Sequence, residues 1–309
     1  MTLREVVNRV VELLGKCDAL EPEVRRDAAR EGRLLVAGVL QLSPGGLAQR
    51  LVVEPALKAG EADAIEQALH RRLRGEPLAY ALGHAAFRDL VLHVDARVLI
   101  PRPETEVVVE EALRVAAGSP GGVAVDIGTG SGAIALALAT EGHFDRVIAT
   151  DISTDALAVA SANAEAMGLR GSATAAHQRS ATAATATGTP VEFRHGADLA
   201  PLQDVSARVI VSNPPYIAYE EAIALPPSVR NWEPPVALFA PNNGLARYAE
   251  LVHGARRVLE PGGWLVLELD ANRAAPVVTM AEAAGYDAVQ VKQDLAGRDR
   301  VLLARAPAR

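Results

Sequence analysis

Residues 209–217 read VIVSNPPYI, an apolar run that stops at Asn213 and turns through Pro214 and Pro215 to Tyr216. A continuous apolar run bounded by a turn signal is typical of a buried strand in a parallel sheet. Such strands present ligand-handling residues just past their carboxyl ends. We therefore expect Asn213 at the mouth of a binding site.

The segment Asn213–Tyr216 carries the groups needed to bind a planar amino group. The rings of Pro214 and Pro215 fix φ at about −65°, which makes the turn stiff. The Asn213 side-chain oxygen and the Pro214 carbonyl then offer two acceptors for the hydrogens of an NH₂ group, and Tyr216 offers an aromatic face. A strand followed by an ordinary proline turn also explains Pro-Pro. The hypothesis therefore needs a cofactor site upstream.

Such a site is indicated by residues 123–132, VAVDIGTGSG, where an apolar strand runs into a glycine-rich turn. Glycines let the backbone turn tightly and approach a ligand closely before the next helix begins. The spacing is GxGxG, not the GxGxxG of dinucleotide-binding folds. The residues that we expect to bind the cofactor here are Asp126, Gly128, Thr129, Gly130, Ser131 and Gly132.

The next predicted strand, RVIATD, ends in Asp151, where a carboxylate can accept both hydroxyls of a ribose. Strand, glycine turn, helix, strand and terminal acid together indicate an adenosine site. The segment Asn213–Tyr216, which we call the clamp, lies downstream, and we expect Asn213 to lie next to the cofactor. The ligand that we expect is therefore S-adenosylmethionine. The sequence indicates no metal site.

Asp198 follows the predicted strand VEFRH, close to where adenine would lie. Its carboxylate is a candidate partner for the exocyclic amine of adenine, although ordinary loop polarity explains it nearly as well. The preceding residues 171–190 are rich in Ala, Thr and Ser without an acid, and we expect a mobile surface loop there.

The stretch IPRPETEVVVEEAL, beginning at Ile100, has the features of a helix N-terminus. Pro103 fits the first helical position, and acidic residues in the first turn complement the helix dipole. That reading accounts for Glu104 but not for Arg102. We take Arg102 and Glu104 as candidate substrate contacts.

The remaining pattern predicts helices before the sheet and alternating strands and helices after it. Residues 87–99 alternate as a hairpin would. The predicted helices are 3–14, 23–40, 47–52, 62–73, 133–139, 153–167 and 244–259, the last closed by Pro261-Gly262-Gly263, and the late strands are 264–269, 288–291 and 300–304. Seven strands alternating with helices predict a doubly wound α/β sheet.

The amino-acid composition argues against several classes of function. The chain has 309 residues, 50% of them apolar and 22% charged, and a formal net charge of −7. That acidic balance argues against wholesale binding to phosphate backbones. One cysteine excludes an internal disulfide, and no stretch is long and apolar enough to span a bilayer. We expect a cytoplasmic protein with no membrane association.

Several motifs together resemble the HemK/PrmC family of protein-glutamine methyltransferases. They are GEPLAYALG at 75–83, VLIPRPETE at 98–106, DIGTGSGAIALALA at 126–139, SNPPYI at 212–217, WEPPVAL at 232–238 and DLAGRDRV at 294–301. The resemblance runs from about residue 70 to 303.

The resemblance implies a helical substrate-recruiting domain at 1–74, a hairpin linker at 75–100 and a methyltransferase domain at 101–309. The last of these is a Rossmann-like class I methyltransferase domain of seven strands, the final one antiparallel. The substrates implied are class I peptide chain release factors, methylated on the glutamine of their Gly-Gly-Gln loop. By motif, Gly128, Gly130 and Gly132 would hold the methionine part of the cofactor, and residues 213–216 the substrate amide. We expect a monomer.

Three alternatives stay open from the sequence. A related enzyme class methylates a glutamine of a large-subunit ribosomal protein with the same clamp. Adenine amino-methyltransferases on DNA or RNA also use NPPY, but this chain lacks a basic, aromatic-studded stripe. A non-catalytic cofactor-binding adaptor would have no need of two aligned acceptors.

Overall fold

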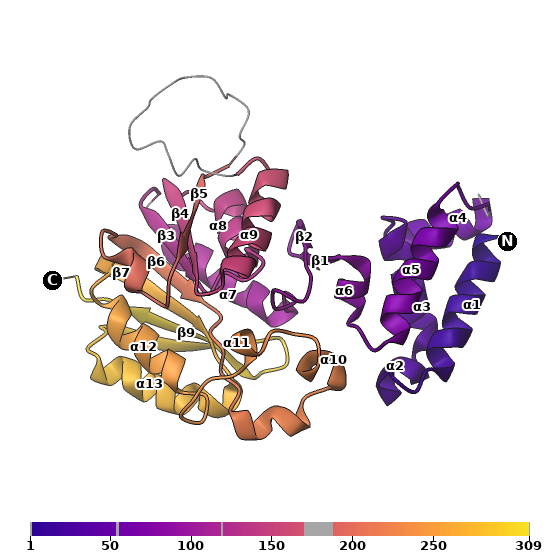
Figure 1. The fold of residues 1–309 in the computed structure, drawn as a ribbon. Helices are drawn as coiled ribbons and strands as arrows, with labels where there is room; N and C mark the ends of the chain where they lie inside the picture. Colours follow the sequence, from indigo (N-terminus) through magenta and orange to yellow (C-terminus); the bar gives the residue numbers. More distant parts are fainter. Residues whose placement is uncertain (1, 54–55, 119, 170–187, 309) are drawn as a thin grey trace. The chain divides into compact units, whose positions relative to one another are not determined.

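The computed structural model describes residues 2–53, 56–118, 120–169 and 188–308 (Figure 1). Of the segment 171–190, only residues 188–190 are described, so the expected surface loop falls almost wholly outside the described residues.

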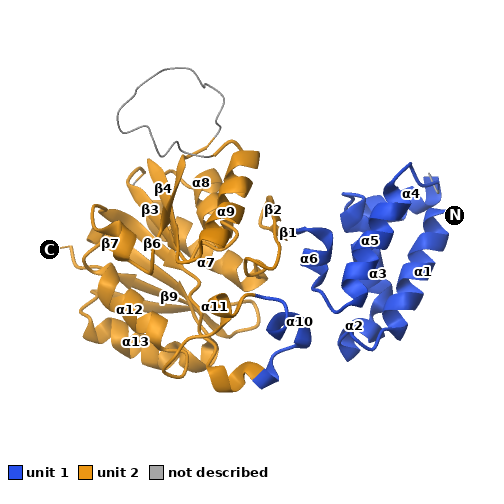
Figure 2. Cartoon of the chain, in the orientation of Figure 1, with its two compact units in different colours: residues 1–85, 223–233 blue, residues 86–222, 234–309 orange. Residues whose placement is uncertain are grey.

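The chain divides into two compact units (Figure 2). Unit 1 holds Met1–Ala85 and Ile223–Glu233, and unit 2 holds Ala86–Ala222 and Pro234–Arg309. A short segment that follows the NPPY stretch therefore belongs with the N-terminal helices. The domain boundaries expected after residues 74 and 100 stay predictions.

Unit 1 is a helical bundle, as the sequence predicts. Its first helix begins with a capping box: Thr2 Oγ1 accepts the Glu5 N–H, and the Glu5 carboxylate accepts the Thr2 N–H. The same helix buries Leu3, Val10 and Leu14 in the bundle core. The helices of unit 1 are α1 (Leu3–Lys16), α2 (Pro22–Arg26), α3 (Ala28–Val39), α4 (Pro44–Val53), α5 (Glu61–Leu73), α6 (Leu78–Leu82) and α10 (Pro227–Arg230).

Two boundaries in unit 1 differ from the sequence-based prediction. Residues 23–40 form two helices because Asp27 leaves helical geometry, with φ −109° and ψ 35°. Helix α4 begins at Pro44, a residue well suited to a first helical position, and Ser43 Oγ accepts the Gly46 N–H at 3.0 Å. The helix predicted from residue 47 therefore begins three residues earlier. Helix α6 has no counterpart among the predicted helices.

A two-stranded hairpin of β1 (His84–Phe87) and β2 (Leu90–His93) precedes the sheet. It lies earlier than the predicted 87–99. The chain after β2 turns instead, because the Asp95 carboxylate accepts the backbone N–H of Arg97 at 3.0 Å and its Nε–H at 2.9 Å. Helix α7 (Pro103–Ala116) then begins at Pro103, as predicted.

Unit 2 is built on a seven-stranded sheet in the order β5-β4-β3-β6-β7-β9-β8. Strand β9 runs antiparallel to both neighbours, and the other pairs are parallel. The strands are β3 (Val123–Ile127), β4 (Arg146–Asp151), β5 (Val191–His195), β6 (Ala207–Ser212), β7 (Leu259–Glu268), β8 (Ala288–Gln293) and β9 (Asp299–Arg305). This confirms the predicted doubly wound α/β sheet and the antiparallel last strand.

Helices cover both faces of the sheet (Figure 1). Residues Val209 and Val211 of β6 pack into the core shared with α7 and α8 (Ala133–Glu141). Ile210, between them, packs into the core shared with α12 (Ala246–Ala255) and α13 (Ala274–Ala283). Successive side chains of a strand point to opposite faces, so a strand covered on both sides is apolar throughout.

Strand β7 corrects the prediction for residues 244–263. Helix α12 ends at Ala255, and Pro261-Gly262-Gly263 lies inside β7 instead of closing a helix. The Ala306 N–H donates to the Gly263 carbonyl at 2.8 Å, and the Gly262 N–H donates to the Pro307 carbonyl at 3.1 Å. These contacts with the chain after β9 hold the glycines in the sheet, and the pairing with β6 shifts register between Ala207 and Val209.

The other elements of unit 2 are α9 (Thr154–Ala166), α11 (Pro235–Leu238), and the short turns η1 (Ala200–Leu202) and η3 (Ala271–Arg273). The short turn η2 (Tyr219–Ala224) begins in unit 2 and ends in the segment of unit 1 that starts at Ile223. Helix α9 is capped by Ser153, whose side chain accepts the Ala156 N–H, as predicted. Across the described part of the chain, none of the helices is both long and apolar enough to cross a bilayer.

Candidate active site

The NPPY segment begins where β6 ends, at the carboxyl edge of the sheet. Ser212, the last residue of β6, donates its hydroxyl hydrogen to the Ile127 carbonyl at 2.7 Å and so ties β6 to the end of β3. Asn213, Pro214 and Pro215 follow directly and line a pocket. Their position at a strand end is the one predicted from the apolar run.

The glycine turn after β3 lines the same pocket. Gly128 and Gly130 have φ of +73° and +55°, a region that favours glycine, and a Cβ on either would meet no atom within 4 Å. The N–H groups of Gly128 and Thr129 both donate to the Thr150 carbonyl at 2.9 Å. The turn is therefore held to β4, and open space remains beside its backbone.

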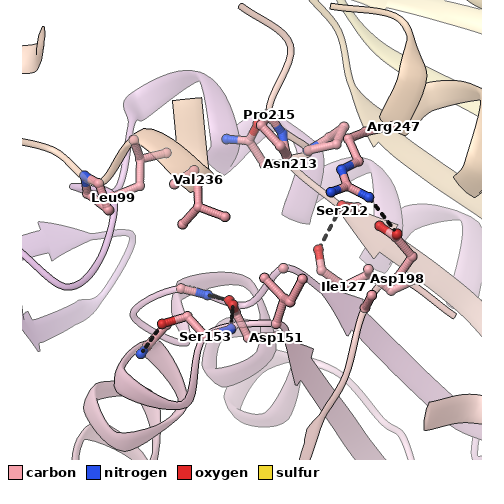
Figure 3. A pocket seen from close by; sticks show the side chains of 18 of the residues that line it. Leu99, Ile127, Asp151, Ser153, Asp198, Ser212, Asn213, Pro215, Val236 and Arg247 are labelled. Carbon is pink, nitrogen blue, oxygen red and sulfur yellow. Dashed lines mark hydrogen bonds and ion pairs between the residues drawn. The ribbon is translucent and has the colours of Figure 1, made fainter. Parts of the chain in front are cut away.

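Asp151, at the end of β4, is held by two backbone groups. Its Oδ2 accepts the Gly130 N–H and its Oδ1 accepts the Ser153 N–H, both at 2.9 Å. Figure 3 shows Asp151 and Asn213 on opposite sides of the pocket. Each carboxylate oxygen keeps lone-pair capacity for a further donor.

The space between these residues is about 820 Å³, including the open mouth. The apolar walls come from Val98, Leu99, Ile127, Ile152, Val236 and Leu251. Both ends of the predicted cofactor site, and the start of the predicted clamp, therefore border one cavity.

Asp126 supports the glycine turn from its buried side and does not line the pocket. It is fully buried, and its Oδ2 accepts the Thr129 hydroxyl at 2.6 Å and the Ala135 N–H at 3.1 Å. Its Oδ1 has no hydrogen-bond partner among the described residues. Burial raises the pKa of Asp126 to about 7, although both hydrogen bonds act against that rise. Ser131 and Gly132 likewise do not line the pocket.

Asp198 lines the pocket in a left-handed conformation, with φ of +47°. Its Oδ2 accepts a hydrogen bond from Arg247 Nη1 of α12 at 2.8 Å, an ion pair drawn in Figure 3. Burial raises the pKa of Asp198, while Arg247 acts in the opposite direction. Arg247 was not predicted from the sequence, because an arginine on a helix gives no signal of which loop it contacts.

Among the predicted substrate contacts, Arg102, Glu104 and Tyr216 do not line this pocket. Tyr216 packs partly buried against the core beside α12 and α13, and burial raises the pKa of its phenol. Gly244 lies against its backbone, because a Cβ on Gly244 would stand 1.9 Å from the Tyr216 carbonyl oxygen. Arg102 immediately precedes α7 and Glu104 lies in its first turn.

Two family models match the chain. Residues 17–83 match the PrmC N-terminal domain, and residues 124–202 match a methyltransferase domain. The release factor glutamine methyltransferase of Cereibacter sphaeroides is 37% identical over 298 residues, which cover 94% of this chain and 98% of the relative. That of Moorella thermoacetica is 38% identical over 305 residues and 98% of both chains.

The chain belongs to the release factor glutamine methyltransferase family. A solved structure with the same fold is a methyltransferase from Pyrococcus furiosus, with a TM-score of 0.51 and 18% identity over 72% of this chain and 91% of that one. The resemblance to the HemK/PrmC family and the class I methyltransferase fold are thereby confirmed.

Two buried polar residues that were not predicted from the sequence lie behind the clamp of this methyltransferase. Thr105, in the first turn of α7, accepts a hydrogen bond from Asn213 Nδ2 at 3.1 Å. The Thr105 hydroxyl donates in turn to Glu268 Oε2 at 2.6 Å. The available signal was an acid at the end of the apolar run 264–269 and a polar residue on the buried face of α7, shared with Val108 and Val109.

Proposed function

We propose that this methyltransferase transfers a methyl group from S-adenosylmethionine to the side-chain amide nitrogen of the glutamine in the Gly-Gly-Gln motif of class I peptide chain release factors. Such a modification would tune translation termination. The observation that carries the proposal is the placement of Asn213 across one pocket from Asp151 (Figure 3). Pro214 lines the same pocket. Relatives of 37% and 38% identity named as release factor glutamine methyltransferases support the choice of substrate.

The residues around the pocket fit the cofactor. The open space beside Gly128 and Gly130 suits the methionine part, and the free lone pairs of Asp151 suit the ribose hydroxyls. Asp198 would lie near adenine. When bound, S-adenosylmethionine would supply an electrophilic methyl group on its sulfonium. The amide nitrogen would form the new C–N bond as the S–C bond breaks, and it would lose one of its two protons to solvent.

The clamp would act on the substrate amide by position and by polarity. The Asn213 side-chain oxygen and the Pro214 carbonyl would accept the two N–H bonds, and Tyr216 would end the clamp outside the pocket. Because an amide is a poor nucleophile, placing it at close range matters most, and effective molarities of roughly 10⁵ M are available from positioning. The two acceptors also bind more strongly as positive charge develops on nitrogen, which favours the transition state.

The helical unit would recruit the release factor, with Arg102 and Glu104 as further candidate substrate contacts. The match of residues 17–83 to the PrmC N-terminal domain supports this role. We propose a cytoplasmic monomer that binds neither membranes nor nucleic acid directly, in keeping with the net charge of −7.

A competition between substrates tests the proposal. The purified protein is incubated with methyl-labelled S-adenosylmethionine and, separately, an unmodified release factor, ribosomal subunits or duplex DNA. We expect label on the release factor alone. Label on a ribosomal protein or on DNA would support the corresponding alternative enzyme, and cofactor binding without any transfer would support the adaptor.

A further inference from the structure

Asn213 is the front member of a hydrogen-bonded chain that runs away from the pocket. Asn213 Nδ2 lies 3.1 Å from Thr105 Oγ1, which lies 2.6 Å from Glu268 Oε2. The three residues come from the end of β6, the first turn of α7 and the end of β7. Thr105 and Glu268 are only 4% and 1% exposed, so solvent does not compete for these bonds.

When Glu268 is ionised, the donors and acceptors available in the Asn213–Thr105–Glu268 hydrogen bonds determine the orientation of the Asn213 side-chain amide. A carboxylate can only accept, and a hydroxyl has a single hydrogen to give. Thr105 therefore donates to Glu268 and can only accept from Asn213, so the NH₂ end of that amide faces Thr105. The amide oxygen is left for a ligand in the pocket.

A protonated Glu268 reverses each bond. The carboxylic acid can donate to Thr105 Oγ1, and the Thr105 hydrogen is then free for the oxygen of the Asn213 amide. The amide turned in this way presents its NH₂ end to the pocket. A donor then stands where the amino group of a substrate needs an acceptor.

We propose that Thr105 and Glu268 are positioning residues, and that the bond from Glu268 through Thr105 sets which end of the Asn213 amide faces the substrate. This inference rests on the proposed function, in which Asn213 accepts a hydrogen bond from the glutamine amide. The inference explains why the buried acid Glu268 lies behind the clamp, although the proposed methyl transfer uses no acid there.

The surroundings of Glu268 place its ionisation near neutrality. Burial raises the pKa of Glu268 to about 7, more than the Thr105 hydrogen bond lowers it. The other titratable and charged groups that act on Glu268 are Arg102 and Glu104 at the start of α7, Arg300 of β9, Tyr216 after β6 and Tyr248 of α12. Arg300 and Arg102 lower the pKa of Glu268, and Glu104 raises it. The fraction of molecules in which Glu268 is ionised and the Asn213 amide oxygen faces the pocket should therefore increase as pH rises through about 7.

The first test is steady-state kinetics on the release factor between pH 6 and 8.5. We expect Thr105→Val to lower kcat by roughly 30- to 100-fold, less than the loss of a donor that itself contacts the reacting group, with the Kd for S-adenosylmethionine unchanged within about twofold. Thr105→Ser, which keeps the hydroxyl, should return kcat to within about threefold of the parent. Thr279→Val, which removes a hydroxyl that donates to the Ala275 carbonyl within its own helix α13, is the matched control.

The second test is the pH profile of Glu268→Gln. The glutamine oxygen can still accept from Thr105, so kcat at pH 8 should stay within about fivefold of the parent. The acidic limb of the kcat profile, present in the parent with an apparent pKa near 7, should be lost. Glu260→Gln, on the same strand and paired with Arg208 at 2.8 Å, should keep that limb.

A readout without the release factor separates this inference from the proposed function. The Asn213 side-chain amide signal, assigned by its loss in Asn213→Ala, should shift between pH 6 and 8 in the parent and stay fixed in Glu268→Gln. If the parent does not methylate release factors yet shows this shift, the proposed function is wrong, but the inference that Thr105 and Glu268 orient the Asn213 amide is supported. A fixed signal in the parent, a parental kcat in Thr105→Val, or an acidic limb retained in Glu268→Gln would each overturn the inference.

Discussion

The Gly130 N–H donates to Asp151 Oδ2 at 2.9 Å, so the glycine turn after β3 is bonded to the acid that ends β4. One carboxylate thus shapes the turn and faces the pocket at the same time. A ligand that bonds to Asp151 meets a turn that is already held in place, which lowers the entropy lost on binding.

Replacing Asp151 should weaken cofactor binding. Asp151→Ala removes a candidate ribose acceptor and releases the N–H groups of Gly130 and Ser153, so we expect the Kd for S-adenosylmethionine to rise roughly 30- to 100-fold. Isothermal titration calorimetry measures it. Asp155→Ala, an exposed acid in the first turn of α9, is the control and should bind as the parent does. Equal losses in both variants would contradict a direct contact from Asp151.

Asn213→Ala should separate catalysis from cofactor binding. The variant loses an acceptor that matters most in the transition state, so kcat should fall by roughly 100-fold or more. The Kd for S-adenosylmethionine should change less than about threefold, because the turn and Asp151 are untouched. Steady-state kinetics and calorimetry on the same preparation give both numbers. Parallel losses in kcat and affinity would argue that Asn213 is a cofactor contact only.

Gly244 should be required for the backbone position of Tyr216. A Cβ there would stand 1.9 Å from the Tyr216 carbonyl oxygen, so Gly244→Ala must displace the end of the clamp, and we expect kcat to fall at least about tenfold. Gly285→Ala is the matched control: its φ of +77° is close to the +80° of Gly244, but no atom lies within 4 Å of the added Cβ. Both variants carry about 1 kcal/mol of backbone strain. Similar activities in the two would show that the contact is unimportant.

The stability of unit 2 should fall as pH rises from about 4.5 to 7. Folded Glu268, with its pKa raised to about 7, keeps a proton that the unfolded chain has lost above about 4.5. Unfolding is therefore favoured increasingly over this window, by about 3 kcal/mol in total, and the effect levels off above pH 7. Asp126, whose pKa burial also raises to about 7, contributes in the same direction.

Urea unfolding at pH 5 and pH 8 measures the predicted fall in the stability of unit 2. Trp264 of β7 serves as the fluorescent probe in a Trp232→Phe background. Adding Glu268→Gln should remove about 3 kcal/mol of the pH dependence. Activity and stability should thus respond to pH in opposite directions. An unchanged pH dependence in the Glu268→Gln protein would contradict the raised pKa of Glu268.

Local sequence patterns predicted the parts of the fold that depend on local chemistry. The apolar runs that end in Asn213 and Asp151 are strands whose ends meet at one edge, since parallel strands place their carboxyl ends together. Pro103 and Ser153 start helices where their chemistry favours a start. These signals lie within a few residues of the feature that they predict.

What the sequence did not predict depends on long-range contacts. Residues 223–233 join unit 1, where the Ser228 N–H donates to Glu21 Oε1 at 2.9 Å across 207 positions. The insertion of β9 between β7 and β8, and the pairing that keeps Gly262 and Gly263 within β7, also depend on distant partners. The same holds for Thr105 and Glu268, which are 163 residues apart and meet only in the folded chain.

Mapping the position of the transferred methyl group tests the central claim most directly. An unmodified release factor is incubated with the protein and labelled S-adenosylmethionine, digested, and sequenced by tandem mass spectrometry, beside a release factor whose Gly-Gly-Gln glutamine is replaced by alanine. We predict a single methyl group on the side-chain amide nitrogen of that glutamine and none on the altered substrate. A methyl group on any other residue, or equal labelling of the two substrates, would contradict the assignment of the Asn213–Tyr216 clamp to the glutamine amide.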